Sequence, residues 1–154
     1  MSKQILLFKG KQEIIVLPEF THRAEKLYNF LQEFFESKGY MCEFVETSSN
    51  RQMKQLMTEQ VNYLLGHSKG ATRILKEFNS ASYPNMKGVI VFDPEDICEK
   101  EWNNLQISKL LLVHTINQTQ NYARFNDKIV LKDDHYFNRS LEKIRTFLTK
   151  FLQS

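Results

Sequence analysis

Short apolar runs recur along the chain and are separated by segments with apolar residues at helical spacing. The runs predict β-strands at residues 5–8, 13–17, 41–45, 61–65, 88–92, 110–113 and 129–131. Two of them, 88–92 and 110–113, are apolar without interruption, which is typical of strands buried on both faces of a parallel sheet.

The segments between these runs predict helices. A first helix begins after Thr21, a residue type that caps helix N-termini, and ends at Gly39. Further helices are expected after Asn50, over residues 71–78, through Trp102 and at the C-terminus. The C-terminal helix has its apolar residues on one face, namely Leu141, Ile144, Leu148, Phe151 and Leu152.

This alternation predicts an α/β fold. We expect one domain of residues 1–154, in which helices cover both faces of a doubly wound, mostly parallel sheet in three layers. Ligands of such folds bind just beyond the carboxyl ends of the strands. Ser68, Asp93, His135 and the loop 115–118 all follow predicted strand ends, so we expect them to meet at one site.

Composition narrows the classes of function. Of the 154 residues, 42% are hydrophobic and 25% are charged, values typical of a soluble globular domain. Lys and Arg are scattered and the net charge is +3, so no nucleic-acid partner is expected. No apolar segment approaches the roughly 18 residues of a membrane span, and the run 5–8 is too short for a signal peptide. Cys42 and Cys98 form neither a disulfide framework nor a metal-ligand spacing, which favours a cytoplasmic protein without metal or cofactor.

The most informative segment is residues 66–70, Gly-His-Ser-Lys-Gly. It follows a predicted strand and begins a predicted helix, which is the context of a nucleophile elbow. Such a turn strains the backbone of Ser68 and presents its hydroxyl, while Gly66 and Gly70 avoid clashes with neighbouring backbone. The helix N-terminus directs N–H groups toward an oxyanion formed there. The alternative is an ordinary strand-to-helix turn in which Ser68 caps the helix.

A histidine in a suitable position follows much later in the chain. His135 lies in the loop between the last predicted strand and the C-terminal helix, after the acidic pair Asp133 and Asp134. From the carboxyl end of its strand, the imidazole can reach over a serine at the carboxyl end of another strand. The alternative is a histidine of an ordinary surface loop.

These two motifs give the chain a resemblance to the small, lidless serine hydrolases of the α/β-hydrolase superfamily. The turn 66–70, the segment 135–137 (His-Tyr-Phe) before the last helix, and the order of serine before histidine all match. The resemblance implies that Ser68 is the nucleophile and that His135 is the general base.

The same resemblance implies an oxyanion hole, a pair of backbone N–H groups that bind the negatively charged oxygen of the intermediate. One N–H belongs to Lys69, and the other belongs to the loop after the second strand, at Phe20 or Thr21. Lys69 departs from the family pattern, in which an apolar residue is more usual. Of the remaining histidines, His67 and His114 are expected to be structural. His22 is expected to face solvent in the first turn of its helix, and the alternative is that it lines the pocket.

The acid that would orient His135 is missing from its usual place. The family normally has an aspartate after the penultimate strand, where residues 114–120 contain no acid. Three alternatives stay open: Asp93 serves from the preceding strand end, the amide of Asn117 orients the imidazole, or efficient catalysis has been lost. An aspartate followed by proline is also typical of a helix start, in which Asp93 would cap the helix. We expect Asp93 to lie nearest Nδ1 of His135.

The predicted chemistry is acyl transfer. Ser68 attacks the carbonyl of a small-molecule ester or thioester as His135 takes its proton, and water then releases the acid. Lys69 beside the nucleophile and the net positive charge favour an anionic substrate, and the alternative is that Lys69 points into water, as most lysines do. The alternative function is a hydrolase-like scaffold that binds a ligand or protein partner with weak or no catalysis, which the missing acid supports. A transferase that passes the acyl group to an alcohol or thiol is a third alternative.

Overall fold

The structure is a computed structural model that describes residues 13–19, 22–45, 61–77, 86–95, 109–116 and 128–153. Three predicted elements lie outside the described residues: the strand at 5–8, the helix after Asn50 and the helix through Trp102. The same holds for four residues named from the sequence, which are Phe20, Thr21, Cys98 and Asn117.

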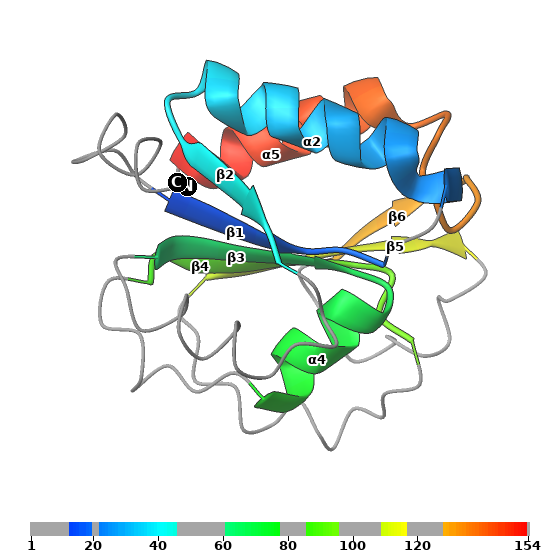
Figure 1. Ribbon diagram of the computed structural model, residues 1–154. Coiled ribbons are helices and arrows are strands. Elements are labelled where there is room, and N and C mark those ends of the chain that lie inside the picture. The colour runs from blue at the N-terminus through cyan, green and yellow to red at the C-terminus, as the bar shows by residue number, and fades with distance from the viewer. Residues whose placement is uncertain are drawn as a thin grey trace.

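A six-stranded parallel sheet forms the centre of the protein (Figure 1). Its strands are β1 (Glu13–Leu17), β2 (Met41–Phe44), β3 (Val61–His67), β4 (Gly88–Phe92), β5 (Leu110–Thr115) and β6 (Lys128–Leu131). They lie in the order β2-β1-β3-β4-β5-β6, and every neighbouring pair is parallel. The predicted doubly wound α/β fold is confirmed. The chain adds β2 on one side of β1 and all later strands on the other, so the switch point lies between β1 and β3.

Helices cover both faces of this sheet in three layers. Helices α2 (Glu25–Ser37) and α5 (Leu141–Gln153) lie on one face, and α4 (Lys69–Glu77) lies on the other (Figure 1). Helix α2 ends as predicted, because Gly39 has a φ of +87° and its N–H donates to the Glu36 carbonyl at 3.0 Å. Its start was predicted too early: a 3₁₀ turn, η1 (His22–Ala24), precedes it, and Ala24 at its N-cap makes no side-chain cap.

Two buried apolar clusters hold the layers together. The larger one joins α2 and α5 to the sheet and includes Phe30, Leu31, Phe34, Ile144, Leu148, Ile14, Leu65 and Ile90. The smaller one joins α4 to the opposite face and includes Ala71, Ile74, Leu75, Leu64, Val89 and Val91. Burying each large apolar side chain contributes about 1.5–3 kcal/mol. Both faces of β4 are covered by helices, so every side chain of this strand is buried, which explains its uninterrupted apolar sequence.

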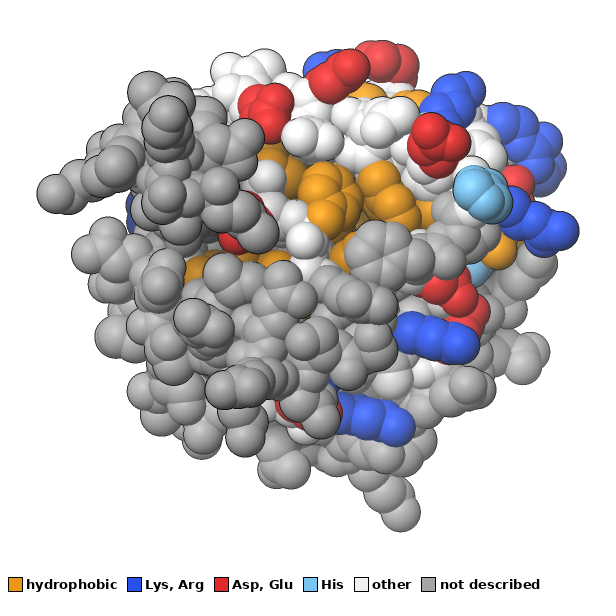
Figure 2. Space-filling view, in the orientation of Figure 1, with side chains coloured by type: hydrophobic (Ala, Val, Ile, Leu, Met, Phe, Trp, Pro, Cys, Tyr) orange, Lys and Arg blue, Asp and Glu red, His pale blue; other side chains and the backbone are white. Residues whose placement is uncertain are grey.

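The carboxyl ends of the strands form a polar end of the molecule. The strand arrowheads point toward the right-hand side of Figure 1, and in Figure 2 the visible histidine side chains lie on that side beside acidic and basic groups. Among the helices of the described ranges, none is both long and apolar enough to cross a membrane.

Candidate active site

Ser68 stands at the junction between β3 and α4. Its backbone has a φ of +58°, in the left-handed region that non-glycine residues rarely adopt. The Ser68 N–H donates to the Phe92 carbonyl of β4 at 2.9 Å, and the Ser68 carbonyl accepts from the Thr72 N–H at 3.0 Å. The side chain is fully buried, and its Oγ has no hydrogen-bond partner within the described residues. The alternative in which this hydroxyl caps α4 is therefore wrong.

Gly66 and Gly70 allow the turn to pack against its neighbours without side chains in between. A Cβ on Gly66 would lie 2.6 Å from the backbone N and Cα of Ala71. A Cβ on Gly70 would lie 1.9 Å from the carbonyl oxygen of Leu17, the last residue of β1. The turn that carries Ser68 is thus pressed against β1, beside the switch point of the sheet.

We expect Gly70→Ala to destabilise the fold by about 3 kcal/mol, because the new methyl group meets backbone that has no rotamer to escape to. The matched control is Gly39→Ala, where nothing lies within 4 Å and only the φ of +87° opposes the substitution. That strain costs about 1–2 kcal/mol. Urea unfolding of both variants checks this, and equal losses would contradict the close approach of Gly70 to β1.

Asp93 follows β4 and lies almost entirely buried, with 1% of its surface exposed. Its Oδ1 accepts the N–H of Thr115 at 3.0 Å and the Thr115 hydroxyl at 3.3 Å, while Oδ2 lies 2.5 Å from Nδ1 of His135. The Asp93 N–H donates to the Val113 carbonyl at 2.8 Å, so pairing with β5 fixes its backbone. Among the described residues, Asp93 therefore contacts Nδ1 of His135, as predicted from the sequence. The catalytic role of the pair stays a prediction.

The loop that carries His135 is organised by the buried carboxylate of Asp133. This carboxylate accepts the N–H of Asp134 at 2.7 Å, the N–H of Arg139 at 2.8 Å and the hydroxyl of Ser140 at 2.7 Å. Burial alone raises the pKa of Asp133, but these hydrogen bonds outweigh it and lower the pKa overall. Asp133 therefore folds the loop as an anion and holds His135 at the carboxyl end of β6.

Strained backbone gathers at this end of the sheet. Within the described residues, positive φ at non-glycine positions occurs at Ser68, at Asp93 (+46°) and at Phe137 (+57°). Phe137 is fully buried and packs edge-on against Phe92 at a ring distance of 5.6 Å, which anchors the loop just after His135. Backbone strain of this kind costs about 1–3 kcal/mol per residue and clusters at functional sites.

Ser68 and His135 are not hydrogen-bonded to each other. Ser68 Oγ and His135 Nε2 each lack a hydrogen-bond partner within the described residues. Nε2 instead faces two carboxylates, Glu95 Oε1 at 3.1 Å and Glu19 Oε2 at 3.6 Å. The 3.1 Å contact is an ion-pair distance without hydrogen-bond alignment. The two atoms therefore do not form a hydrogen bond in this conformation, and the catalytic pairing of Ser68 with His135 stays a prediction.

The surroundings of His135 set both its tautomer and its proton affinity. Because Asp93 can only accept, the neutral imidazole carries its hydrogen on Nδ1, and Nε2 is left as a base. Burial is the largest influence on the pKa of His135 and lowers it. The hydrogen bond and charge of Asp93, with the charges of Glu95 and Glu19, outweigh burial, so the pKa is raised above 6.5.

Glu19, Glu95 and His135 form a group of side chains, among the described residues, whose chemistry suits a cation. The ligand atoms of Glu19, Glu95 and His135 lie within 4.8 Å of one another. Two carboxylates and an imidazole suit a divalent metal in kind. All three side chains are partly exposed, however. Acidic groups on a protein surface often lie this close to a histidine without binding an ion, so these distances do not identify a metal site.

His67 is more than the packed residue expected from the sequence. It is fully buried, Nδ1 lies 2.7 Å from the Tyr28 hydroxyl, and Nε2 lies 2.7 Å from the carbonyl oxygen of His135. Burial, the largest influence, holds the pKa of His67 down to about 4, so the ring is neutral. His114 is buried at the end of β5 with Nδ1 2.8 Å from the Thr115 carbonyl, whereas His22 is exposed.

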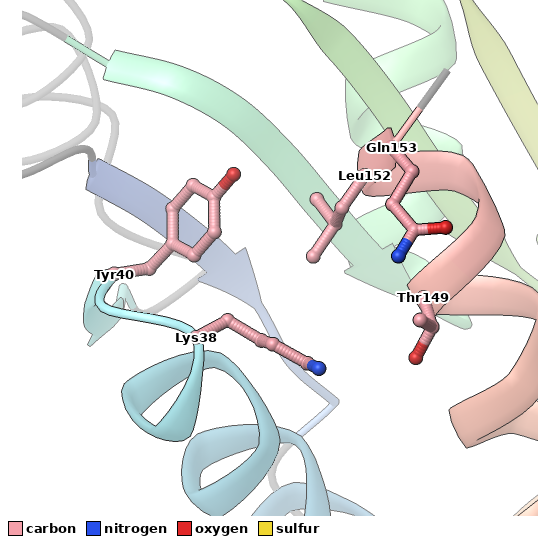
Figure 3. Close-up of a pocket in the computed structure, with 5 residues that line it drawn as sticks. All are labelled: Lys38, Tyr40, Thr149, Leu152 and Gln153. Carbon is pink, nitrogen blue, oxygen red and sulfur yellow. The ribbon is translucent and has the colours of Figure 1, made fainter.

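A shallow hollow elsewhere on the protein has a volume of about 160 Å³. It lies between the end of α2 and the last turns of α5 (Figure 3), and its lining consists of Lys38, Tyr40, Thr149, Leu152 and Gln153. Tyr40 immediately precedes β2, so the hollow lies at the amino ends of the strands. Ser68, Asp93 and His135 do not line it, and their contacts locate the candidate site at the other end.

No family model and no curated protein matches this chain in sequence. Solved structures match it in fold. Est1E from Butyrivibrio proteoclasticus superposes with a TM-score of 0.64 at 13% identity, covering 94% of this chain and 89% of that chain. The esterase domain of a Rhodothermus marinus protein gives 0.63 at 13% identity, covering 91% and 85%. A Xanthomonas campestris pv. campestris protein provisionally assigned as a hydrolase of the α/β superfamily gives 0.62 at 16% identity, covering 93% and 99%. At such identities the likeness establishes an α/β-hydrolase-like fold.

Proposed function

We propose that the protein is a serine hydrolase that cleaves a small-molecule ester or thioester. Ser68 is the nucleophile, His135 is the general base and Asp93 orients His135. The observation that carries this proposal is the 2.5 Å contact between Asp93 Oδ2 and His135 Nδ1, at the sheet end where the strained and buried Ser68 stands. The fold shared with esterases supports the same class of reaction. On this proposal the turn 66–70 is a nucleophile elbow.

The reaction begins when His135 Nε2 takes the proton of Ser68 Oγ as Oγ attacks the substrate carbonyl. Asp93 keeps Nε2 free of hydrogen and stabilises the imidazolium. The backbone N–H of Lys69, at the first position of α4, has no partner within its helix and binds the oxyanion. Phe20 N–H is the second predicted donor and lies outside the described residues. The imidazolium then protonates the leaving group, and water releases the acid by the same steps.

One rearrangement precedes this chemistry, because Ser68 Oγ and His135 Nε2 are not yet hydrogen-bonded. Ser68 Oγ must turn toward Nε2 by rotation about χ1. The imidazole must also turn Nε2 away from Glu95, which lies 3.1 Å from it. This same contact favours the alternative function, a hydrolase-like scaffold that binds a ligand or protein partner with little catalysis.

The substrate is proposed to be a small acyl compound in an open pocket without a lid. Lys69 is exposed, whereas Glu19 and Glu95 face the histidine, so the site surroundings oppose the anionic substrate predicted from Lys69. A cytoplasmic location, one domain over residues 1–154, and a reaction without metal or cofactor remain part of this proposal.

The proposal predicts hydrolysis of p-nitrophenyl acetate with a kcat/KM that rises with pH. The rise reports loss of the proton from His135, so its midpoint should lie above 6.5, because the pKa of His135 is raised. Glu95→Gln should move the midpoint down, because it removes a negative charge 3.1 Å from Nε2 that stabilises the imidazolium. Initial rates across the pH range in which histidine titrates measure both effects.

The matched control is Glu33→Gln, an exposed carboxylate on α2, which should leave the midpoint unchanged. Hydrolysis no faster than that of heat-denatured protein would contradict the proposed function. A midpoint that stays in place in Glu95→Gln would contradict the assignment of the titrating base to His135.

A further inference from the structure

A line of hydrogen bonds joins four separate segments of the chain next to the proposed site. The N–H of Glu19, just after β1, donates to the Tyr28 hydroxyl of α2 at 2.7 Å. That hydroxyl lies 2.7 Å from Nδ1 of His67 at the end of β3, and Nε2 of His67 lies 2.7 Å from the carbonyl oxygen of His135. His67 is fully buried and Tyr28 is half-buried, so water competes little for these bonds.

The direction of each bond follows from donor and acceptor chemistry. A carbonyl only accepts, so His67 Nε2 carries a hydrogen. The ring is neutral because burial holds its pKa down to about 4, and Nδ1 must therefore accept. Among the described residues, the Tyr28 hydroxyl is the donor within hydrogen-bond distance of Nδ1, so its single hydrogen goes to Nδ1. The Glu19 carbonyl, at 2.8 Å from the hydroxyl, competes for this hydrogen. The line thus runs one way, from the Glu19 N–H through Tyr28 and His67 to His135.

The charged groups around His67 are compatible with this neutral tautomer. The ring of His135 lies 4.9 Å away, and a charge on it disfavours a charge on His67. Glu19 and Asp93 act in the opposite direction, but burial is the larger influence. Burial also raises the pKa of Tyr28, so its hydroxyl keeps the hydrogen that it donates.

We propose that His67 and Tyr28 are positioning residues that fix where His135 stands relative to Ser68 and Asp93. The effect on catalysis rests on the proposed function, in which His135 is the base. His67 directly precedes Ser68 in the chain, so its bond to the His135 carbonyl sets the spacing between the nucleophile's turn and the histidine loop. Proton transfer takes no route through His67. A displacement of a catalytic group by about 1 Å can lower the rate about 10²-fold.

Three variants test the positioning role. His67→Phe keeps a buried ring but cannot donate, and Tyr28→Phe removes only the hydroxyl. His67→Gln offers an amide N–H near the position of Nε2 and should recover most of the activity. We expect kcat to fall about 10²-fold in His67→Phe and about 10-fold in Tyr28→Phe, with little change in KM. The matched control is Tyr40→Phe, which loses a tyrosine hydroxyl near Tyr63 outside the site and should keep wild-type kcat.

Nitrogen-15 NMR of the histidine rings gives a readout that needs no activity. We expect His67 to be neutral with its hydrogen on Nε2 at every pH well above about 4. In Tyr28→Phe and His67→Phe, the titration midpoint of His135 should fall, because its contact with Asp93 loosens and burial then dominates. Tyr40→Phe should leave that midpoint in place.

A His67 that carries its hydrogen on Nδ1, or is charged at neutral pH, would overturn the inferred line of bonds. Wild-type kcat and an unmoved His135 midpoint in Tyr28→Phe, which removes a single hydroxyl and should fold, would overturn the positioning role. A wild-type protein without ester hydrolysis contradicts the proposed function instead. In that case the positioning role is decided by the two NMR readouts alone, which are the tautomer of His67 and the titration midpoint of His135.

Discussion

Replacing Ser68 by alanine should abolish hydrolysis of an activated ester. Loss of a serine nucleophile lowers kcat about 10⁶-fold, because no other group forms the acyl bond. The fold should survive, since Ser68 Oγ makes no hydrogen bond within the described residues and its removal leaves no partner unpaired. Alanine at a φ of +58° carries a strain similar to that of serine. Turnover of p-nitrophenyl acetate, with urea unfolding as the check on folding, measures the effect.

Ser37→Ala is a suitable control, because Ser37 is an exposed serine at the end of α2 whose hydroxyl donates to the Phe34 carbonyl at 2.6 Å, away from the candidate site. It should keep wild-type turnover. A Ser68→Ala variant that hydrolyses the ester as fast as wild type would assign the activity to another group. In that case Ser68 is not the nucleophile.

Asp93→Asn should lower kcat about 10⁴-fold while leaving Ser68 in place. The side-chain oxygen of an asparagine can still accept the N–H of Thr115. Its NH₂ group, however, donates a hydrogen to Nδ1 of His135, so Nδ1 must accept instead of donate. The imidazole then carries its hydrogen on Nε2 and cannot take the proton of Ser68. Asparagine tolerates the φ of +46° at this position, so the backbone should not change.

Asn117→Ala is the comparison that separates the two orienting residues considered from the sequence. We expect it to keep wild-type kcat on the same ester. A severe loss in Asn117→Ala together with a mild one in Asp93→Asn would make the amide the partner of His135. Full activity in both variants would remove the orienting residue altogether and leave a serine–histidine dyad.

The fold could be predicted from the sequence because its strands are short apolar runs separated by helical patterns. The ends of elements were harder to place. The predicted strand ended at residue 65, since Gly66 and His67 resemble a turn, yet both continue β3 and pair with Val91 and Phe92 of β4. Local sequence carries no information about this pairing, which depends on the neighbouring strand. The start of α2 was misplaced for a similar reason, because a 3₁₀ turn intervenes.

The contact of Asp93 with His135 could be anticipated because both follow strands, and parallel strands bring their carboxyl ends to one edge of the sheet. Thr115, in the loop 115–118 expected at the site, was found by this argument. Glu19 and Glu95 follow β1 and β4, and the same argument applied to every strand end would have found them too. Their acidic side chains instead looked like those of ordinary loop and helix-start residues.

The partnership of Tyr28 with His67 had no signal in the sequence. The two residues are separated by 39 positions and meet only because α2 packs on the face of the sheet beside the end of β3. A tyrosine at helical spacing reads as part of the apolar face, and a histidine before a serine reads as part of the turn. Hydrogen bonds between such residues become visible only when the packing of the elements is known.

The central claim is that Ser68 is an activated nucleophile, and covalent labelling tests it most directly. The purified protein is treated with a fluorophosphonate, digested and mapped by tandem mass spectrometry. We predict a single adduct on Ser68, none in Ser68→Ala, and much slower labelling in Asp93→Asn. A wild-type protein that remains unlabelled, or carries its adduct on another residue, would contradict the account.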